Sequence, residues 1–406
     1  MKSVKKFLVA DLFSGAGGAS YGFKAHPEFE LVFAADRQNG KPCNGVGTLE
    51  CNKTYAKNIG VDPLEIDLGD IEPSDLLREM GLKPGRLDVL ISCAPCTGFS
   101  RALNQNHIED DPRNHLVGRT GLFVEAIRPK FLVMENAREL IMGNFSHHSR
   151  ELCDHLERLG YSYTAEVHML SKYGLPQSRE RALIIARRDG KGVKSLADLW
   201  FGHRLREEAK TVRRAIADLP HVSAGESHPD DPMHVSPSLG KTSTLERLKA
   251  IPRDGGSWAD LINHPNSDEL LIPSMKRAVE AGKLGSHPDV YGRLWWDRPS
   301  VTIKRECGHT GNGRYAHPAQ DRLCTVRELA CLQGFPTSYH FVAKNLANMY
   351  RHIGDAVPPM ISYQLAHLCY WMLTGSKPSV QELVLEGTNL RDKDFVLAHE
   401  QKILFA

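Results

Sequence analysis

The sequence predicts an α/β fold built around an open sheet, and three observations support this prediction. Short apolar strands recur along the first half of the chain, and polar or glycine-rich turns follow their carboxyl ends. The first of these strands leads through a glycine turn into a helix. A cysteine stands in a turn directly after another strand, and ligands and catalytic groups collect at this edge of an open α/β sheet.

Length and composition indicate a globular protein. The chain has 406 residues, enough for two domains with substantial cores, and it is 41% hydrophobic and 25% charged. It has no recognisable signal peptide and no apolar run long enough to cross a bilayer, so we expect a cytoplasmic protein without a membrane partner. Nine cysteines without a regular framework suit a reducing compartment. A net charge of +2 neither indicates nor excludes nucleic acid binding.

The first strand, glycine turn and helix together predict a nucleotide-type pocket. The apolar run Lys6–Phe13 is followed by Ser14–Gly18 and then by a predicted helix over Ala19–Ala25. Glycines let the backbone approach a ligand, and the start of a helix offers free N–H groups. The second strand, Glu30–Ala35, ends at Asp36, where a carboxylate accepts hydrogen bonds from a ribose or lies simply on the surface.

The cysteine turn is the strongest candidate for chemistry. The strand Asp88–Ile91 breaks into Pro95-Cys96-Thr97-Gly98, which places the Cys96 thiol at the carboxyl end of a strand. Most cysteines are small buried hydrophobes, but this turn is too polar to fill a core. Cys93 and Cys96 also form a Cys-x-x-Cys pair, and the lack of a second such pair argues against zinc.

Polar side chains also stand at later strand ends. The apolar run Lys130–Met134 leads directly into Glu135, while Gln177, Arg179 and Arg181 precede and enter the next apolar run. Because these last three occupy alternate positions, an extended segment presents them on one face. Charged faces are usually only solvated, but polar groups at several strand ends of one sheet indicate a shared site.

Other parts of the chain are predicted to be rich in loops. Asn39–Gly47 reads as an inserted loop, and Pro220–Asn266 is rich in His, Ser, Pro, Gly and Asp with little periodicity. That composition suits either a recognition surface built from loops or a variable linker. The tail Ser376–Ala406 mixes apolar and charged residues, so that docking on the large domain and docking on a partner both remain open.

Six motifs in order resemble those of the DNA cytosine-5 methyltransferases. They are DLFSGAGG from Asp11, the Pro-Cys turn with Phe-Ser after it, ENA from Glu135, QSRER from Gln177, TVRELACLQGFP, and IGDAVPP, which ends at Pro359. The resemblance implies a Rossmann-type S-adenosylmethionine-dependent methyltransferase domain and a smaller, loop-rich target-recognition domain. We expect the first over residues 1–190, the second over 191–337, and a segment returning to the catalytic domain over 338–406.

The resemblance also implies a division of catalytic roles. Carbon 5 of cytosine is a poor nucleophile, so the Cys96 thiolate adds first to carbon 6 and activates the ring toward a methyl sulfonium. Glu135 would contact ring nitrogen 3 and the exocyclic amine. Arg181 would hold the carbonyl oxygen of the base, and Arg179 would steady the thiol or its loop.

The cofactor implied by the resemblance is S-adenosylmethionine, released as S-adenosylhomocysteine, with no metal. The glycine turn would surround its methionine and adenine parts, Asp36 would bind its ribose, and residues near the C-terminus would close the site. The full set of cofactor residues implied in this way is Phe13, Gly15, Gly17, Asp36, Asp70, Ile71, Pro95, Leu116, Asp355 and Val357.

Three departures from the family pattern accompany these assignments. Thr97 replaces the usual Gln after the catalytic cysteine, and Asp355 replaces the usual Asn of the last motif, exchanging an amide for a carboxylate that only accepts hydrogen bonds. The insertion Asn39–Gly47 lengthens the segment after Asp36.

The expected partner is double-stranded DNA. The DNA-binding candidates are Ser100, Gln177, Lys304 and Arg305, because polar and basic side chains meet phosphates and base edges. We expect a monomeric, bacterial-type modification enzyme that turns the target cytosine out of the duplex. A cognate restriction enzyme or another defence system is left open.

Two neighbouring functions on the same fold remain as alternatives. One is a transfer RNA cytosine-5 methyltransferase, and the other is a catalytically silent DNA-binding homologue. A nicotinamide dehydrogenase would share the first strand, its turn and Asp36. It would not need Cys96, Glu135 and Arg181 at successive strand ends.

Overall fold

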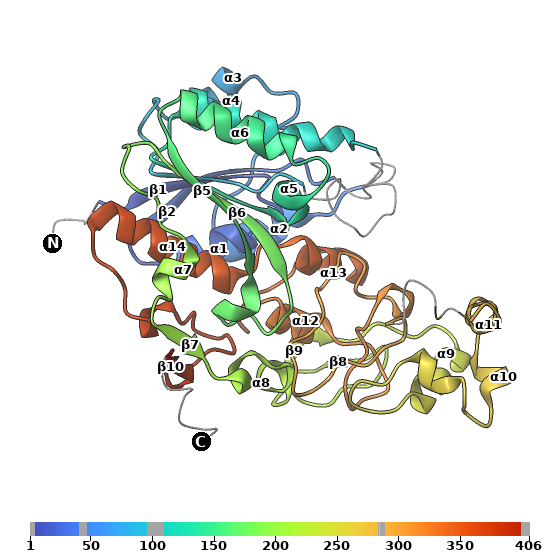
Figure 1. Ribbon diagram of the computed structural model, residues 1–406. Coiled ribbons are helices and arrows are strands. Elements are labelled where there is room, and N and C mark those ends of the chain that lie inside the picture. The colour runs from blue at the N-terminus through green and yellow to red at the C-terminus, as the bar shows by residue number, and fades with distance from the viewer. Residues whose placement is uncertain (1–4, 40–46, 96–108, 283, 285–288, 399–406) are drawn as a thin grey trace.

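The computed structural model describes residues 5–39, 47–95, 109–282, 284 and 289–398. Figure 1 shows a body of helices packed on a sheet and, beside it, a second body made mostly of loops and short helices. Cys96 and Ser100 lie outside the described residues, as does most of the insertion Asn39–Gly47. No helix among the described residues is long and apolar enough to cross a membrane.

A six-stranded mixed sheet forms the centre of the first body, which confirms the predicted α/β class. The strand order is β2-β1-β3-β4-β6-β5. Strands β2, β1, β3 and β4 run parallel to one another, while β6 is antiparallel to both of its neighbours. The strands are β1 (Phe7–Leu12), β2 (Phe29–Ala35), β3 (Val89–Ser92), β4 (Phe131–Ala137), β5 (Ser162–Met169) and β6 (Glu180–Arg187).

Helices cover both faces of this sheet, because alternate strand residues point to opposite sides. Val9 and Val133 belong to a core shared with α1 and α14, whereas their neighbours Ala10 and Leu132 belong to the core under α4 and α6. In Figure 1, α3, α4 and α6 lie above the sheet and α1 and α14 below it. The helices of this body are α1 (Gly18–Ala25), α2 (Cys51–Ile59), α3 (Pro73–Glu79), α4 (His115–Ile127), α5 (Glu139–Met142), α6 (His147–Arg158), α7 (Leu196–Leu199) and α14 (Pro359–Thr374).

Helix α14 packs on α1, which returns the end of the chain to its beginning. A side chain at Gly22 would collide with the backbone of Ser362 and Tyr363, so this close approach requires glycine. The Ser362 hydroxyl accepts a hydrogen bond from the Gly22 N–H at 3.1 Å and donates one to the Gly18 carbonyl at 3.0 Å. Residues near α14 are thereby brought to the glycine turn at the start of α1.

The second body has its own core with little regular structure around it. Buried arginines replace part of the hydrogen bonding that a sheet would supply: Arg293 is fully buried and donates to four backbone carbonyls, and Arg322 forms a buried ion pair with Glu328 at 2.7 Å. The elements here are α8 (Val212–Ile216), β8 (Ser227–His228), β9 (Asp231–Val235), α9 (Thr242–Ala250), α10 (Ser267–Leu270), α11 (Pro273–Glu280), α12 (Val326–Leu332) and α13 (Leu346–Asp355).

The members of the two hydrophobic cores suggest where one domain passes into the other. Leu196 and Leu205 pack in the core of the sheet, whereas the core of the second body begins at Val212 and extends to Ala356. The predicted limits of the second domain were residues 191 and 337. We therefore propose that this domain begins near Val212 and includes α13.

The tail after α14 packs against both bodies as far as it is described. Strand β10 (Phe395–Leu397) pairs with β7 (His203–Leu205), and Leu390 packs in the core of the sheet. Asp394 forms an ion pair with Arg214 at 2.9 Å. Of the two possibilities open from the sequence, the structure therefore supports docking within the chain for residues 376–398.

Candidate active site

A cavity of about 240 Å³ opens at the carboxyl ends of the parallel strands, as the fold predicts. Its walls come from the turn after β1, the ends of β2, β3 and β4, and the segment that joins α13 to α14. Of the predicted cofactor residues, Phe13, Gly15, Asp36, Pro95, Leu116, Asp355 and Val357 line this cavity. The structure thus brings together residues from both ends of the chain.

The turn after β1 has the backbone geometry that its composition predicts. Gly15 has φ of 51°, and a side chain there would meet no atom within 4 Å, because the position faces the cavity. Phe13 lines the cavity with φ of 58°, which is rare outside glycine and is found at functional sites. Gly17 caps α1 with φ of 89° and packs against Tyr55 and Tyr339, so it shapes the turn without lining the cavity.

Asp36 connects the glycine turn to the end of β2. One carboxylate oxygen accepts from the Gly15 N–H at 2.9 Å and the other from the Gln38 N–H at 2.6 Å. The Cys51 thiol lies 3.6 Å from the second oxygen. Desolvation in the cavity wall raises the pKa of Asp36 above its usual value, and these hydrogen bonds oppose the shift. A carboxylate with free lone pairs therefore faces the cavity beside the turn.

Asp70 and Ile71 do not line the cavity, although the sequence predicts them at the adenine edge. Their backbone N–H groups both donate to the Asp67 carbonyl, and this turn leaves Asp70 exposed. Asp67 and Leu68 line the cavity instead. Asp67 forms an ion pair with Arg37 and accepts from the Gly69 N–H at 2.9 Å. Since Asp67 and Asp70 stand only three residues apart in the sequence, only the turn geometry distinguishes between them.

Asp355, the residue that departs from the family pattern, also lines the cavity. Its carboxylate lies 3.2 Å from Nε of Arg305, a side chain that also lines the cavity. Although 38% of the Asp355 side chain is open to the cavity, desolvation raises its pKa to about 6, against the influence of Arg305 and Arg179. An ion pair therefore stands where the family has an amide.

Glu135 lines the cavity and forms an ion pair with Arg181 on the neighbouring strand. The Glu135 carboxylate lies 2.9 Å from Nε of Arg181, and both side chains are mostly buried. Antiparallel pairing of β4 and β6 brings the two together. The next residue, Asn136, donates to the Ala94 carbonyl at 3.0 Å, which ties the end of β4 to the turn that leads to Cys96.

The side chains of Gln177 and Arg179 are buried and form hydrogen bonds within the protein. Gln177 is fully buried, and its amide donates to the Gln333 side chain at 2.6 Å. Its side chain is therefore turned away from the surface in this structure, and its contact with DNA stays a prediction. Arg179 is 2% exposed and donates to the carbonyls of Ile303 and Ala356. Alternate spacing predicted one shared face for these residues. That face is covered by the second body, a contact that periodicity cannot reveal.

The remaining DNA candidates differ in exposure. Lys304 is exposed and free to face a phosphate, whereas the Arg305 side chain is only 18% exposed and turns into the cavity. No sequence signal separated these two neighbours, because both are basic residues in the same loop.

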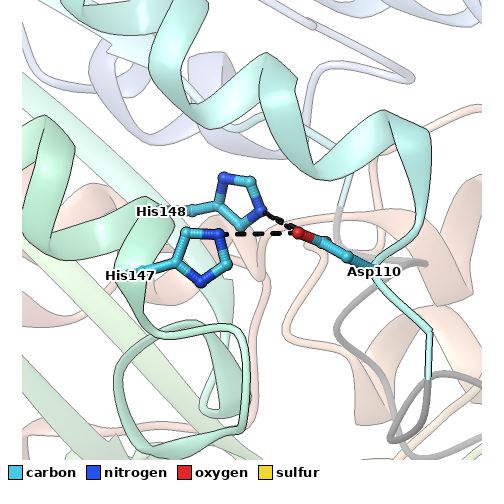
Figure 2. A group of neighbouring side chains, drawn as sticks. All are labelled: Asp110, His147 and His148. Carbon is cyan, nitrogen blue, oxygen red and sulfur yellow. Dashed lines mark hydrogen bonds and ion pairs between the residues drawn. The ribbon is translucent and has the colours of Figure 1, made fainter.

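One group among the described residues has the composition of a metal site. Asp110, His147 and His148 offer ligand atoms that all lie within 4.8 Å of one another. Figure 2 shows both imidazoles directed at the Asp110 carboxylate, with the His148 contact at 2.9 Å and the His147 contact at 3.5 Å. Asp110 also accepts from the Asn114 amide at 2.7 Å. These contacts tie the start of α6 to the segment before α4.

Comparisons with known proteins agree with this geometry. A profile of the C-5 cytosine-specific DNA methylase family matches residues 7–371. The chain is 32% identical to Type II methyltransferase M1.HphI of Haemophilus parahaemolyticus, covering 90% of this chain and 87% of the relative. It is 29% identical to Type II methylase M.HgiDII of Herpetosiphon aurantiacus, covering 88% and 93%. The crystal structure of the S. pombe Dnmt2 methyltransferase superposes with a TM-score of 0.57 at 18% identity, over 91% of this chain and 99% of that one, and so supports the fold.

Proposed function

The chain belongs to the C-5 cytosine-specific DNA methylase family, and from this premise we propose how its residues divide the reaction. As a member of that family it is a DNA cytosine-5 methyltransferase that uses S-adenosylmethionine. The observation that carries the assignment of residues is the ion pair between Glu135 and Arg181, because Glu135 lines the same cavity as the glycine turn.

The lining of the cavity suits S-adenosylmethionine in its donors, acceptors and apolar surface. The N–H groups at the start of α1 suit the methionine carboxylate, since the helix dipole favours an anion there. Asp36 and Asp67 offer acceptors to hydroxyl and amine groups, and Leu116 and Phe13 offer apolar surface. When bound, the cofactor supplies an electrophilic methyl group on a sulfonium.

Cys96 is the nucleophile in this proposal. Its thiolate adds to carbon 6 of the cytosine, the pyrimidine ring then becomes nucleophilic at carbon 5, and loss of the carbon 5 proton after methylation releases the thiol. Glu135 contacts ring nitrogen 3 and the exocyclic amine, and Arg181 holds Glu135 in place while its remaining N–H groups meet the carbonyl oxygen of the base. Arg179 also acts as a structural anchor, because its two terminal nitrogens donate to the carbonyls of Ile303 and Ala356.

The target base must leave the duplex to reach this site. Carbon 6 is inaccessible in the base stack, so the cytosine must be turned out of the duplex. Breaking its stacking and pairing costs roughly a few kcal/mol of free energy, which contacts between the DNA and the second body would offset. The exposed Lys304 is suited to a phosphate. The Type II names of the relatives support the role of a modification enzyme beside a restriction enzyme.

Methyl transfer from tritiated S-adenosylmethionine tests this proposal and its alternatives. The purified protein is incubated with unmethylated duplex DNA or with transfer RNA, and labelled nucleosides are identified by chromatography. We expect labelled 5-methylcytosine in DNA. Label in transfer RNA alone would support the RNA enzyme, and cofactor binding without label in either would support a silent homologue.

A further inference from the structure

The segment Ile303–Arg305 is fixed to the catalytic body on two sides. The Ile303 N–H donates to Oε1 of Gln177 at 2.9 Å, and the Ile303 carbonyl accepts from Arg179 at 3.1 Å. On the other side, a side chain at Gly354 would collide with the backbone of Lys304 and Arg305. The segment therefore has little freedom to shift without moving α13, which ends at Asp355.

Within this segment, two adjacent basic residues point to different places. Lys304 is exposed, while Arg305 reaches Asp355 in the cavity wall at 3.2 Å with a side chain that is 18% exposed. Asp36 also lines this cavity, and its charge raises the pKa of Asp355. The guanidinium of Arg305 thus offsets repulsion between carboxylates that face the same ligand.

We propose that Arg305 is a positioning residue that couples DNA binding to cofactor binding through its ion pair with Asp355. Because the segment and α13 move together, DNA that binds at Lys304 shifts both, and the ion pair then sets the position in which the cofactor meets the carboxylate of Asp355. The inference rests on the proposed function, because it requires that DNA and S-adenosylmethionine bind to these two surfaces. Coupling of this kind is reciprocal, so the cofactor tightens DNA binding by the same factor.

The test measures the Kd of S-adenosylhomocysteine by calorimetry, with and without saturating sheared, unmethylated bacteriophage DNA. In the wild type we expect DNA to lower this Kd by about fivefold or more. In Arg305→Met and in Asp355→Asn the ratio should fall to near one, and the double variant should show no further change. Arg305→Lys, which keeps a cation in reach, should restore part of the ratio.

Lys304→Met tests the DNA side of the coupling, since it removes the charge through which DNA acts, and that charge does not face the cavity. It should weaken DNA binding and reduce the ratio, while leaving the Kd of S-adenosylhomocysteine in the absence of DNA unchanged. Circular dichroism checks that each variant is folded. If Arg305→Met does not fold, Asp355→Asn still tests the ion pair, because Asn keeps the size and shape of the Asp side chain. A wild-type ratio in both Arg305→Met and Asp355→Asn would overturn the coupling while leaving the methyltransferase assignment intact. Failure of the wild type to bind S-adenosylhomocysteine at all would overturn both.

Discussion

The Glu135 carboxylate and the Arg181 guanidinium lie 2.9 Å apart across the antiparallel strands β4 and β6. This contact is made by two residues far apart in the sequence, and Glu135 lines the cavity beside the turn that leads to Cys96. A buried carboxylate needs a partner, and Arg181 supplies it. The pair therefore gives Glu135 a defined orientation before any base arrives.

Replacing Glu135 should reduce methyl transfer with little effect on DNA binding. Glu135→Gln keeps the size of the side chain but removes its proton-transfer chemistry, and general acid–base groups contribute roughly 10²- to 10⁴-fold to a rate. We expect a fall in kcat of that order, measured by tritium transfer to DNA. Glu30→Gln, an exposed glutamate on β2, is the control and should leave kcat unchanged. Equal rates for Glu135→Gln and wild type would remove Glu135 from the site.

Replacing Arg181 should reduce stability as well as activity. Arg181→Ala leaves the mostly buried Glu135 carboxylate without its partner, a change that typically costs about 3–5 kcal/mol. Urea unfolding should show a loss of this order, and adding Glu135→Gln to the variant should recover part of it. No recovery in the double variant would mean that the loss arises from packing and not from the unpaired charge.

Asp67 and Asp70 provide a matched pair for the cofactor site. Asp67→Asn should weaken binding of S-adenosylhomocysteine, because a hydrogen bond is worth roughly 0.5–1.5 kcal/mol net, or up to about tenfold in affinity. Asp70→Asn makes the same chemical change at an exposed position three residues later in the same turn and should leave the affinity unchanged. Calorimetry distinguishes the two; a larger loss for Asp70→Asn would favour the sequence-based assignment.

Asp11 should make stability depend on pH. It is fully buried in β1, one oxygen accepts from the Ser20 hydroxyl at 2.6 Å, and the other has no hydrogen-bond partner among the described residues. Desolvation raises the pKa of Asp11 from 3.8 to about 7. The native state therefore keeps a proton that the unfolded chain releases between pH 3.8 and about pH 7.

Across that window the free energy of unfolding of the wild type should fall, relative to Asp11→Asn, by roughly 1.4 kcal/mol per pH unit as the pH rises. Other titrating groups affect the wild type and Asp11→Asn equally, so their contribution cancels in the difference between the two proteins. Urea unfolding at pH 5 and pH 7 measures the gap between the two proteins, and a constant gap would show that Asp11 is not protonated in the native state.

Local sequence patterns predicted the parts of the site that depend on local structure. The glycine turn and the strand ends at Asp36 and Glu135 agree with the structure, because the order of strands and turns determines them. The return of Val357 to the cavity was implied only by the resemblance to the family, and Val357 lines the cavity. Long-range packing decided the rest. Gln177 is buried because the second body covers it, and Arg305 turns inward because Gly354 brings its backbone close to Asp355.

The central claim, methyl transfer through a covalent intermediate at Cys96, is tested most directly by trapping. Duplex DNA containing 5-fluorocytosine blocks loss of the carbon 5 substituent, so the enzyme should remain bound to the base after methyl transfer. With S-adenosylmethionine present, mass spectrometry of the digested complex should place the adduct on Cys96, and Cys96→Ser should form none. An adduct on another residue, or one that still forms in Cys96→Ser, would contradict the account.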